Sequence, residues 1–281
     1  MANEISAGKL YLVGTPIGNL GDISPRAAQT LEAVDFIAAE DTRVSLKLLN
    51  HLGIKKPLIS YHEHNQLESG EKILRRLLAG ESCAVVTDAG MPAVSDPGEG
   101  IVVMCRESGV PVEVIPGPCA LVCAAALSPI PTQRFTFEGF LSRNTKSRRE
   151  HLAGLVNEKR AMIFYEAPHK IIYTLNDLRE YLGDRRASLC REITKLHEEV
   201  ITDTLTNLIA LYDEKSPKGE YVIVIEGANE EVQEITMDEG VSMVLEQLTA
   251  GSRLKDAVKM ISDKTGLNKN ALYDAALKSK E

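Results

Sequence analysis

Residues 10–40, LYLVGTPIGNLGDISPRAAQTLEAVDFIAAE, decide the fold class of this chain. The apolar run LYLVGT (10–15) predicts a buried strand, because it leads into TPIGNLGD, a turn rich in Gly, Pro and Asn. Ser24 and Pro25 then occupy the N-cap and the first position of a predicted helix. FIAAE (36–40) predicts a second strand, so that a strand, a helix and another strand follow one another closely.

The same alternation continues beyond this stretch. Helical spacing predicts helices over residues 42–52, 66–79 and 98–108, the first of which ends at Gly53. Short apolar runs predict strands over 58–61, 83–88 and 112–115. Strands that alternate with helices through short connections form a mainly parallel sheet with helices on both faces. The first half of the chain therefore predicts the α/β fold class.

A second α/β region follows the proline-rich break SPIPTQ (128–133). Strands are predicted in FTFEGF, AMIFYEAP, SLCRE, EEVITDT and EYVIVIEG, with helices near residues 146–156 and 168–181. Residues 226–246 then hold seven acidic residues and no basic one, whereas residues 253–281 hold seven basic and four acidic residues. This change predicts a small helical unit after an acidic connector. The predicted domains are residues 1–127, 128–230 and 231–281.

Composition excludes several classes of protein. The 281 residues are 44% hydrophobic and 26% charged, which is typical of folded soluble domains, and the net charge of −8 disfavours a protein that coats nucleic acid. The first residues lack the features of a secretion signal, and the longest apolar run, 119–127, is too short to span a bilayer. The five cysteines are odd in number and form no CxxC motif. We therefore expect reduced thiols and a cytoplasmic location.

Three glycine- and proline-rich loops each follow a predicted strand of the first domain. They are GTPIGNLGD (14–22), TDAGMPAVSDPGEG (87–100) and IPGPCA (115–120). Ligands of open α/β sheets bind beyond the carboxyl ends of the strands, so these loops are expected to converge on one site. The first loop also fits a tight turn, and the second fits a plain surface loop. Cys119 could be a nucleophile at a helix start, but no basic residue adjoins it, and the apolar helix that follows is expected to be fully buried.

Polar residues also gather at other strand ends. FYEAPHK (164–170) and REITKLHEE (191–199) belong to the second region, and AAEDTR (38–43) to the first, where Asp41 could simply cap a helix. His62 and His64 have no third partner with metal-ligand spacing, so we expect no metal site. A GxSxG motif is missing as well, which disfavours serine hydrolase chemistry.

Six motifs in order carry a family resemblance: VGTPIGNLGDISPRA, AAEDTR, SYHEHN, TDAGMPAVSDPG, PGPCA and FYEAPHK. Together they resemble the ribosomal small-subunit RNA methyltransferase I family, within the tetrapyrrole-methylase-like (class III) S-adenosylmethionine-dependent methyltransferases. The similarity extends over nearly the whole chain and includes GLNKNALYDAAL near the C-terminus. It implies two α/β domains with a cofactor cleft between them, a homodimer, and 2′-O-methylation of a cytidine ribose in small-subunit (16S) ribosomal RNA.

The resemblance also implies which residues hold S-adenosylmethionine. In relatives, Ser or Thr usually follows the Pro-Gly-Pro motif, whereas this chain has Cys119, so a hydroxyl contact to the cofactor is not expected there. The implied cofactor-binding residues are Gly14, Thr15, Pro16, Asp88, Ala89, Gly90, Met91, Pro92, Ser95, Asp96, Pro116, Cys119, Ala120 and Tyr165.

Residue types suggest roles in such a reaction. A ribose hydroxyl is a weak acid, so a base or a cation near the developing alkoxide would accelerate the transfer. Glu166 and Asp41 are candidate bases, and Arg43, Arg191 and Lys195 are candidates for steering a phosphate or stabilising the alkoxide. The cations expected to contact RNA, which also fit an ordinary solvated surface, are Arg143, Lys146, Arg148 and Arg149 in SRNTKSRR, and Lys269.

Two other functions fit the same motifs. The fold would also serve a methyltransferase that acts on a tetrapyrrole, such as a cobalamin or sirohaem precursor. A non-catalytic RNA-binding factor for ribosome assembly is the second alternative. The basic SRNTKSRR segment and the basic residues 253–281 favour RNA, because a macrocycle would require neither. We expect the assembled small subunit, rather than free RNA, to be the partner.

Overall fold

The first sheet consists of five parallel strands. The computed structural model describes residues 8–212, 217–228, 236–249 and 251–279. The strand order is β3-β2-β4-β1-β5, and every neighbouring pair is parallel, as predicted. The strands are β1 (Leu10–Val13), β2 (Phe36–Ala39), β3 (Leu58–Ser60), β4 (Cys83–Val86) and β5 (Val112–Ile115).

Helices cover both faces of this sheet because its side chains alternate between them. Tyr11 and Val13 pack in one cluster with α1 (Pro25–Ala33) and α2 (Thr42–Leu52). Leu10 packs on the opposite face with α3 (Gln66–Leu78) and α4 (Glu99–Glu107). The helices on both faces explain why the inner strands β1, β2 and β4 are apolar and almost entirely buried, whereas the edge strands β3 and β5 are partly exposed.

The helix boundaries follow from the predicted capping residues. The Ser24 hydroxyl accepts a 3.0 Å hydrogen bond from the backbone N–H of Ala27, and Pro25 is the first residue of α1. Gly53 ends α2 with a φ of 73°, a left-handed conformation that favours glycine.

The second sheet is mixed, with order β6-β7-β10-β8-β9. Only β6 and β7 are parallel, and the other three pairs are antiparallel. The connection from β8 to β9 holds no helix, so the chain returns directly as an antiparallel neighbour. The strands are β6 (Phe135–Phe140), β7 (Ala161–Glu166), β8 (Arg186–Arg191), β9 (Glu199–Thr204) and β10 (Tyr221–Ile225).

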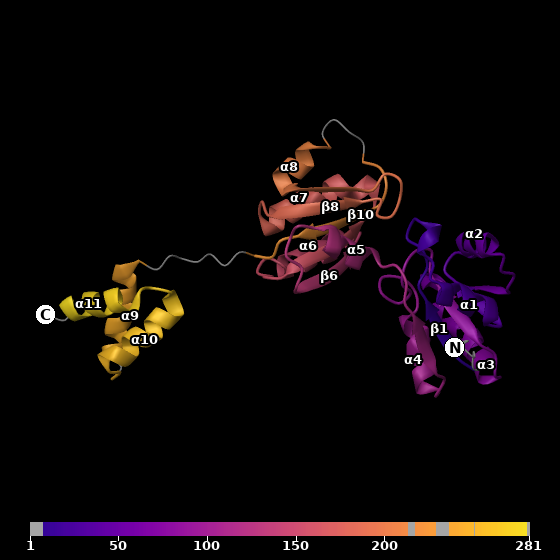
Figure 1. Ribbon diagram of the computed structural model, residues 1–281, viewed down its shortest axis with the longest axis horizontal. Coiled ribbons are helices and arrows are strands. Elements are labelled where there is room, and N and C mark those ends of the chain that lie inside the picture. Colours follow the sequence, from indigo (N-terminus) through magenta and orange to yellow (C-terminus); the bar gives the residue numbers. More distant parts are fainter. Residues whose placement is uncertain (1–7, 213–216, 229–235, 250, 280–281) are drawn as a thin grey trace. The chain divides into compact units, whose positions relative to one another are not determined.

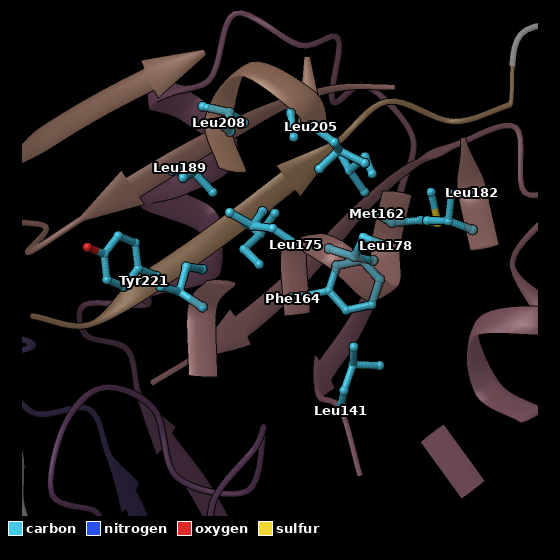
Figure 2. Close-up of a cluster of buried hydrophobic side chains, with 14 of the residues drawn as sticks. Leu141, Met162, Phe164, Leu175, Leu178, Leu182, Leu189, Leu205, Leu208 and Tyr221 are labelled. Atoms are coloured by element: carbon cyan, nitrogen blue, oxygen red, sulfur yellow. The ribbon is translucent and has the colours of Figure 1, made fainter. Parts of the chain in front are cut away.

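A leucine-rich core holds three helices against one face of this sheet (Figure 2). Phe164 and Met162 of β7 pack there against Leu175 and Leu178. The helices are α6 (Thr145–Gly154), α7 (Ile171–Leu182) and α8 (Leu205–Ala210). This core extends along one face of the sheet. Its close packing fixes the positions of the strand ends that border the site described below.

The other face of the second sheet is covered by α5 (Ala120–Leu127). Leu121 and Ala124 pack there with Ile163 and Val222. The sequence suggested a fully buried helix, but Val122 is 57% exposed, so this expectation is wrong. An entirely apolar sequence hides which side of a helix packs, because it shows no polar face.

The last three described helices form a small unit of their own (Figure 1). Contacts divide the chain into two compact units, residues 1–228, which contain both sheets, and residues 229–281. Val244, Ala257, Ile261 and Leu272 form the core of the second unit. The helices are α9 (Met237–Thr249), α10 (Leu254–Thr265) and α11 (Lys269–Lys278). None of the helices in the described part of the chain is long and apolar enough to cross a membrane.

Candidate functional site

The loops after β1 and β4 leave the first sheet at its topological switch point. These strands are neighbours, yet the helices that follow them, α1 and α4, lie on opposite faces of the sheet. Such divergence opens a crevice at the carboxyl ends of the strands. Thr15 and Gly90 bridge the two loops through reciprocal backbone hydrogen bonds of 2.9 and 3.1 Å.

Two glycines let a third loop join them. A Cβ built on Gly14 would lie 2.6 Å from the sulfur of Met91 and 2.7 Å from the Cα of Gly117. A Cβ on Gly117 would lie 2.8 Å from the Cα of Gly14. Contacts this short exclude any side chain, so glycine at both positions permits the three predicted loops to converge.

A cavity of about 390 Å³ lies where these loops meet the second sheet. This volume is within the usual range for small-molecule sites, roughly 300–1,000 Å³. The loops after β1, β2 and β4 and the start of α5 contribute Ile17, Glu40, Asp88, Ala89, Gly90, Met91, Val94, Ser95, Asp96, Cys119 and Ala120. The second sheet contributes Phe140, Tyr165, Glu166, Ala167, Pro168, Glu192, Ile193, Lys195, Glu220, Tyr221 and Val222.

Most of the residues expected to hold a cofactor line this cavity. They are Asp88, Ala89, Gly90, Met91, Ser95, Asp96, Cys119, Ala120 and Tyr165. The others stand outside the lining formed by the described residues, and they are Gly14, Thr15, Pro16, Pro92 and Pro116. Thr15 shows why, since it is only 2% exposed and its hydroxyl donates to the carbonyl of Thr87 at 3.2 Å. Thr15 therefore holds the two loops together and does not line the cavity.

Carboxylates dominate the charge of the cavity. Burial raises the pKa of Glu40, of Asp88 and of Asp96, and the negative charges of their acidic neighbours raise each of them further. Glu40 stays close to the loop after β4, because its carboxylate accepts a 3.4 Å hydrogen bond from the backbone N–H of Asp88. Carboxyl groups with raised pKa values favour a cationic ligand, because a bound positive charge stabilises their ionised form.

Tyr165 forms an aromatic wall. Its hydroxyl accepts a 3.0 Å hydrogen bond from the backbone N–H of Leu121, which ties β7 to the start of α5. Burial raises the pKa of this phenol. Its ring packs edge-on against Phe137 and Phe140, with centroid distances of 5.0 and 5.5 Å.

Glu166 is held by a buried hydrogen-bond chain. Its carboxylate accepts from the backbone N–H of Ala167 at 2.9 Å and from the Thr174 hydroxyl. Arg148 donates to the same hydroxyl at 2.9 Å and also pairs with Asp177. The predicted role of Arg148 in RNA binding is therefore wrong, because this arginine is 4% exposed and its donors are used inside the fold.

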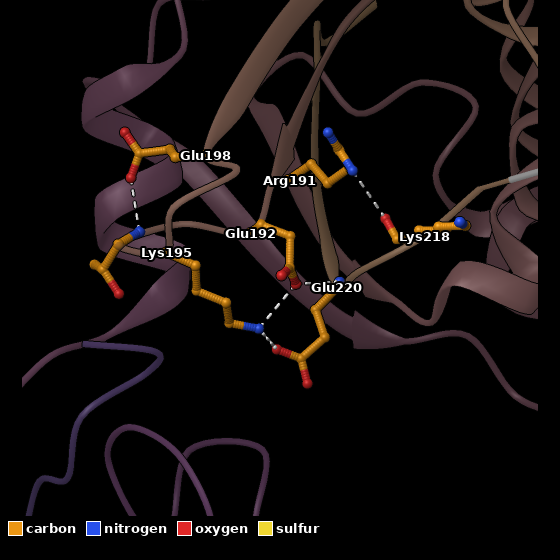
Figure 3. Close-up of polar contacts among 7 residues, drawn as sticks. Arg191, Glu192, Lys195, Glu198, Lys218 and Glu220 are labelled. Carbon is orange, nitrogen blue, oxygen red and sulfur yellow. Dashed lines mark hydrogen bonds and ion pairs between the residues drawn. The ribbon is translucent and has the colours of Figure 1, made fainter. Parts of the chain in front are cut away.

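Lys195 carries the only positive charge among the described residues that line the cavity. Its ammonium group pairs with Glu192 at 2.8 Å and with Glu220 at 2.9 Å (Figure 3). Burial alone would lower the pKa of Lys195, but these two carboxylates outweigh it and the pKa is raised. A Cβ on Gly18 would lie 2.5 Å from the Cγ of Lys195, so glycine in the first loop leaves room for this side chain.

The other proposed catalytic groups lie outside the lining. Asp41 caps α2 by accepting from the backbone N–H of Arg43 at 2.8 Å, and it forms an ion pair with the exposed Arg43 side chain. Hydrogen bonding to Arg43 lowers the pKa of Asp41 to about 2, so this carboxylate is a weak base. Arg191 pairs with Glu199 at 3.0 Å and donates to the carbonyl of Lys218.

Several lining residues escaped the sequence analysis because they depend on the antiparallel pairing. Tyr221 begins β10 and lies in register with Glu166 at the end of β7 and with Arg191 at the end of β8. A parallel sheet would have placed Tyr221 at the opposite edge. Ile17, Val94 and Ile193 lie in segments that the sequence analysis selected, but their apolar side chains suggested no role. Val222 gave no signal, because nothing in the sequence distinguishes it from a core residue.

The remaining predicted RNA contacts are solvent-exposed. Arg143, Lys146 and Arg149 lie at or near the start of α6, where Lys146 forms a loose ion pair with Glu150 at 3.9 Å. Lys269 is the first residue of α11. In the described residues, no group of three or more His, Cys, Asp or Glu side chains is arranged to hold a metal ion, and the cysteines are free thiols.

Two protein families match the chain. Residues 9–209 match Tetrapyrrole (Corrin/Porphyrin) Methylases. Residues 237–280, which comprise the three C-terminal helices, match the RsmI C-terminal HTH domain.

Curated relatives share much of the sequence. Ribosomal RNA small subunit methyltransferase I of Synechocystis sp. is 45% identical over 272 residues, which is 96% of this chain and 98% of the relative. The protein of the same name from Halalkalibacterium halodurans is 43% identical over 95% of this chain and 94% of the relative. That of Thermotoga maritima is 46% identical over 220 residues, which is 78% of this chain but 99% of the relative.

Solved structures share the fold. The methyltransferase CobJ superposes with a TM-score of 0.60 at 18% identity and covers 79% of this chain and 95% of its own. Diphthine synthase gives a TM-score of 0.59 at 15% identity, covering 78% of this chain and 90% of its own. At this identity the likeness concerns the fold alone.

Proposed function

We propose that this chain, which belongs to the ribosomal RNA small subunit methyltransferase I family, transfers a methyl group from S-adenosylmethionine to the 2′-hydroxyl of a cytidine in small-subunit ribosomal RNA. The observation that carries this proposal is the acidic cavity at the switch point, in a chain that matches rRNA methyltransferases over almost its full length. The small subunit, rather than free RNA, is the proposed substrate, and the cytoplasm is the proposed location.

The cavity suits this cofactor chemically. When bound, S-adenosylmethionine supplies a methyl group on a positively charged sulfur, and its ammonium and carboxylate groups leave the whole molecule cationic. Asp88, Asp96 and Glu40 provide the opposite charge. Tyr165 and Met91 offer apolar surface for the remainder of the molecule. These residues would hold the cofactor, and the cavity volume of about 390 Å³ suits a ligand of this class.

Glu166 and Lys195 are the residues proposed to carry the acid–base chemistry. Of the two candidate bases, Glu166 lines the cavity, where its carboxylate can accept the proton of the ribose hydroxyl. Lys195 lines the same cavity and can stabilise the developing alkoxide, because its two carboxylate partners keep it protonated. Alignment of the ribose hydroxyl with the methyl group in this cavity would favour the transfer.

The chain is also proposed to act as a homodimer. Apolar side chains on α5 support this, since Val122 is 57% and Leu127 is 41% exposed. Light scattering on the purified protein would test the proposal, which predicts twice the mass of 30.7 kDa.

An in vitro transfer assay tests the proposed reaction. The purified chain is incubated with methyl-labelled S-adenosylmethionine and small subunits from cells that lack the gene, and the expected result is label on one ribose. Calorimetry with the cofactor alone separates the alternatives. Cofactor binding without transfer to RNA would favour a tetrapyrrole or another acceptor, and no cofactor binding would leave a non-catalytic assembly factor.

A further inference from the structure

Phe140 is exposed beside the cavity because of an irregularity in β6. The register between β6 and β7 shifts between Phe137 and Gly139, and Gly139 adopts a φ of +62°. A bulge of this kind redirects the side chain that follows it. Phe140 is 59% exposed as a result, although it is a large aromatic residue at the end of an edge strand.

This ring stands at the rim shared by two hollows. Phe140 lines the cofactor cavity, where it contacts the edge of Tyr165. It also lines an adjacent, more open hollow formed by Val94, Ser95, Phe137, Glu138, Gly139 and Phe140. Val94 and Ser95 are likewise common to both. A group seated in the open hollow would therefore lie next to the site of methyl transfer.

Glu138 gives this hollow a fixed hydrogen-bond acceptor. Its side chain is 13% exposed, and one carboxylate oxygen lies 2.8 Å from Nε2 of His151. A carboxylate has about four acceptor positions on its two oxygens, so this contact orients the group and leaves acceptor capacity. The hollow thus combines an exposed aromatic face with an oriented carboxylate.

We propose that Phe140 and Glu138 recognise the target base. The base stacks on the Phe140 ring, and the Glu138 carboxylate accepts a hydrogen bond from the exocyclic amino group of cytosine. This inference rests on the proposed function. Proteins read unpaired RNA bases by stacking them on aromatic rings and bonding their edges, and carboxylates accept from the N4 amino group of cytosine. Uracil presents an oxygen at that position, which a carboxylate repels.

Kinetics with small subunits from cells that lack the gene test the role of the ring. Phe140→Ala is expected to raise KM for the subunit roughly tenfold or more, because stacking of a base on an aromatic side chain contributes binding free energy of this order. Phe140→Trp keeps an aromatic face and should raise KM less than Phe140→Ala does. Phe135→Ala is the matched control, because Phe135 lies at the other end of β6 and outside both hollows. An unchanged KM in Phe140→Ala, or an equal loss of cofactor affinity measured by calorimetry, would overturn this assignment.

Base selection tests Glu138. Subunits are reconstituted with uridine in place of the methylated cytidine, once that nucleotide has been mapped. Glu138→Gln is expected to reduce the preference for cytidine, measured as a ratio of kcat/KM values, by about tenfold, because a carboxamide can both accept and donate. Glu150→Gln, in an exposed ion pair on α6, should keep the wild-type ratio.

The outcomes separate the two proposals. Wild-type transfer to cytidine together with an unaltered ratio in Glu138→Gln would refute the base subsite alone. Failure of the wild-type protein to methylate subunits at all would refute the proposed function, and the subsite with it. Cofactor affinity in each variant serves as the check that the fold is intact.

Discussion

Glu166 is the residue on which the proposed chemistry depends. Glu166→Gln should lower kcat by about 10²–10⁴-fold, the usual contribution of a general base. The substitution keeps the side-chain shape, so the dissociation constant of the cofactor should change little. Single-turnover transfer to small subunits measures the effect. A wild-type kcat in Glu166→Gln together with a reduced kcat in Asp41→Asn would assign the role of general base to Asp41.

The acidic residues of the cavity predict how cofactor binding depends on pH. The pKa values of Glu40, Asp88 and Asp96 are raised, mainly by burial, so these groups take up protons at a higher pH than ordinary carboxyls. Protonation removes the negative charge that attracts a cationic cofactor. The dissociation constant should therefore rise as pH falls through the raised pKa values. Asp96→Asn should weaken binding at neutral pH and flatten this dependence, and calorimetry at several pH values is the measurement.

At the scale of the elements, the convergence of three loops depends on Gly14 and Gly117. Gly14→Ala would place a Cβ within 2.7 Å of the Gly117 backbone, so the loops must separate. We expect cofactor affinity to fall by about tenfold or more, since a displacement near 1 Å at a positioned site has effects of that order or larger. Gly154→Ala is the matched control, because a Cβ there meets no atom within 4 Å. Equal affinity in the two variants would contradict this role.

The two sheets differ in how well their elements could be predicted from the sequence. The first sheet was predictable, because Ser24, Pro25 and Gly53 mark helix ends and the apolar runs between them are short. The second sheet was predicted only as α/β, since the register of Tyr221 against Glu166 depends on pairing between distant strands. Arg148 looked like its exposed neighbours because its partner Asp177 is far away in the sequence.

For the whole molecule, the net charge of −8 conceals an uneven distribution. The acidic connector and the carboxylates around the cavity account for a large share of the acids, whereas Arg143, Lys146 and Arg149 are exposed bases. The C-terminal unit matches a helix-turn-helix domain and is basic over residues 253–281. RNA affinity should therefore rest on a few local cations and should decrease with salt.

Removal of the C-terminal unit tests whether this unit contributes to RNA binding and not to cofactor binding. A chain that ends at Ala228 should bind S-adenosylmethionine like the full chain, because both sheets lie in residues 1–228. It should bind small subunits more weakly and with a smaller salt dependence. Identical subunit affinity in both chains would remove the C-terminal unit from RNA recognition.

Methylation of one cytidine ribose of small-subunit ribosomal RNA is the reaction proposed for this protein. Its most direct test is mass spectrometry of that RNA from cells that lack the gene, compared with cells that carry it and with cells complemented by Glu166→Gln. We expect the loss of a single 2′-O-methyl group from a cytidine, restored by the wild-type gene and not by the variant. An unchanged set of ribose methyl groups in the deletion strain would contradict it.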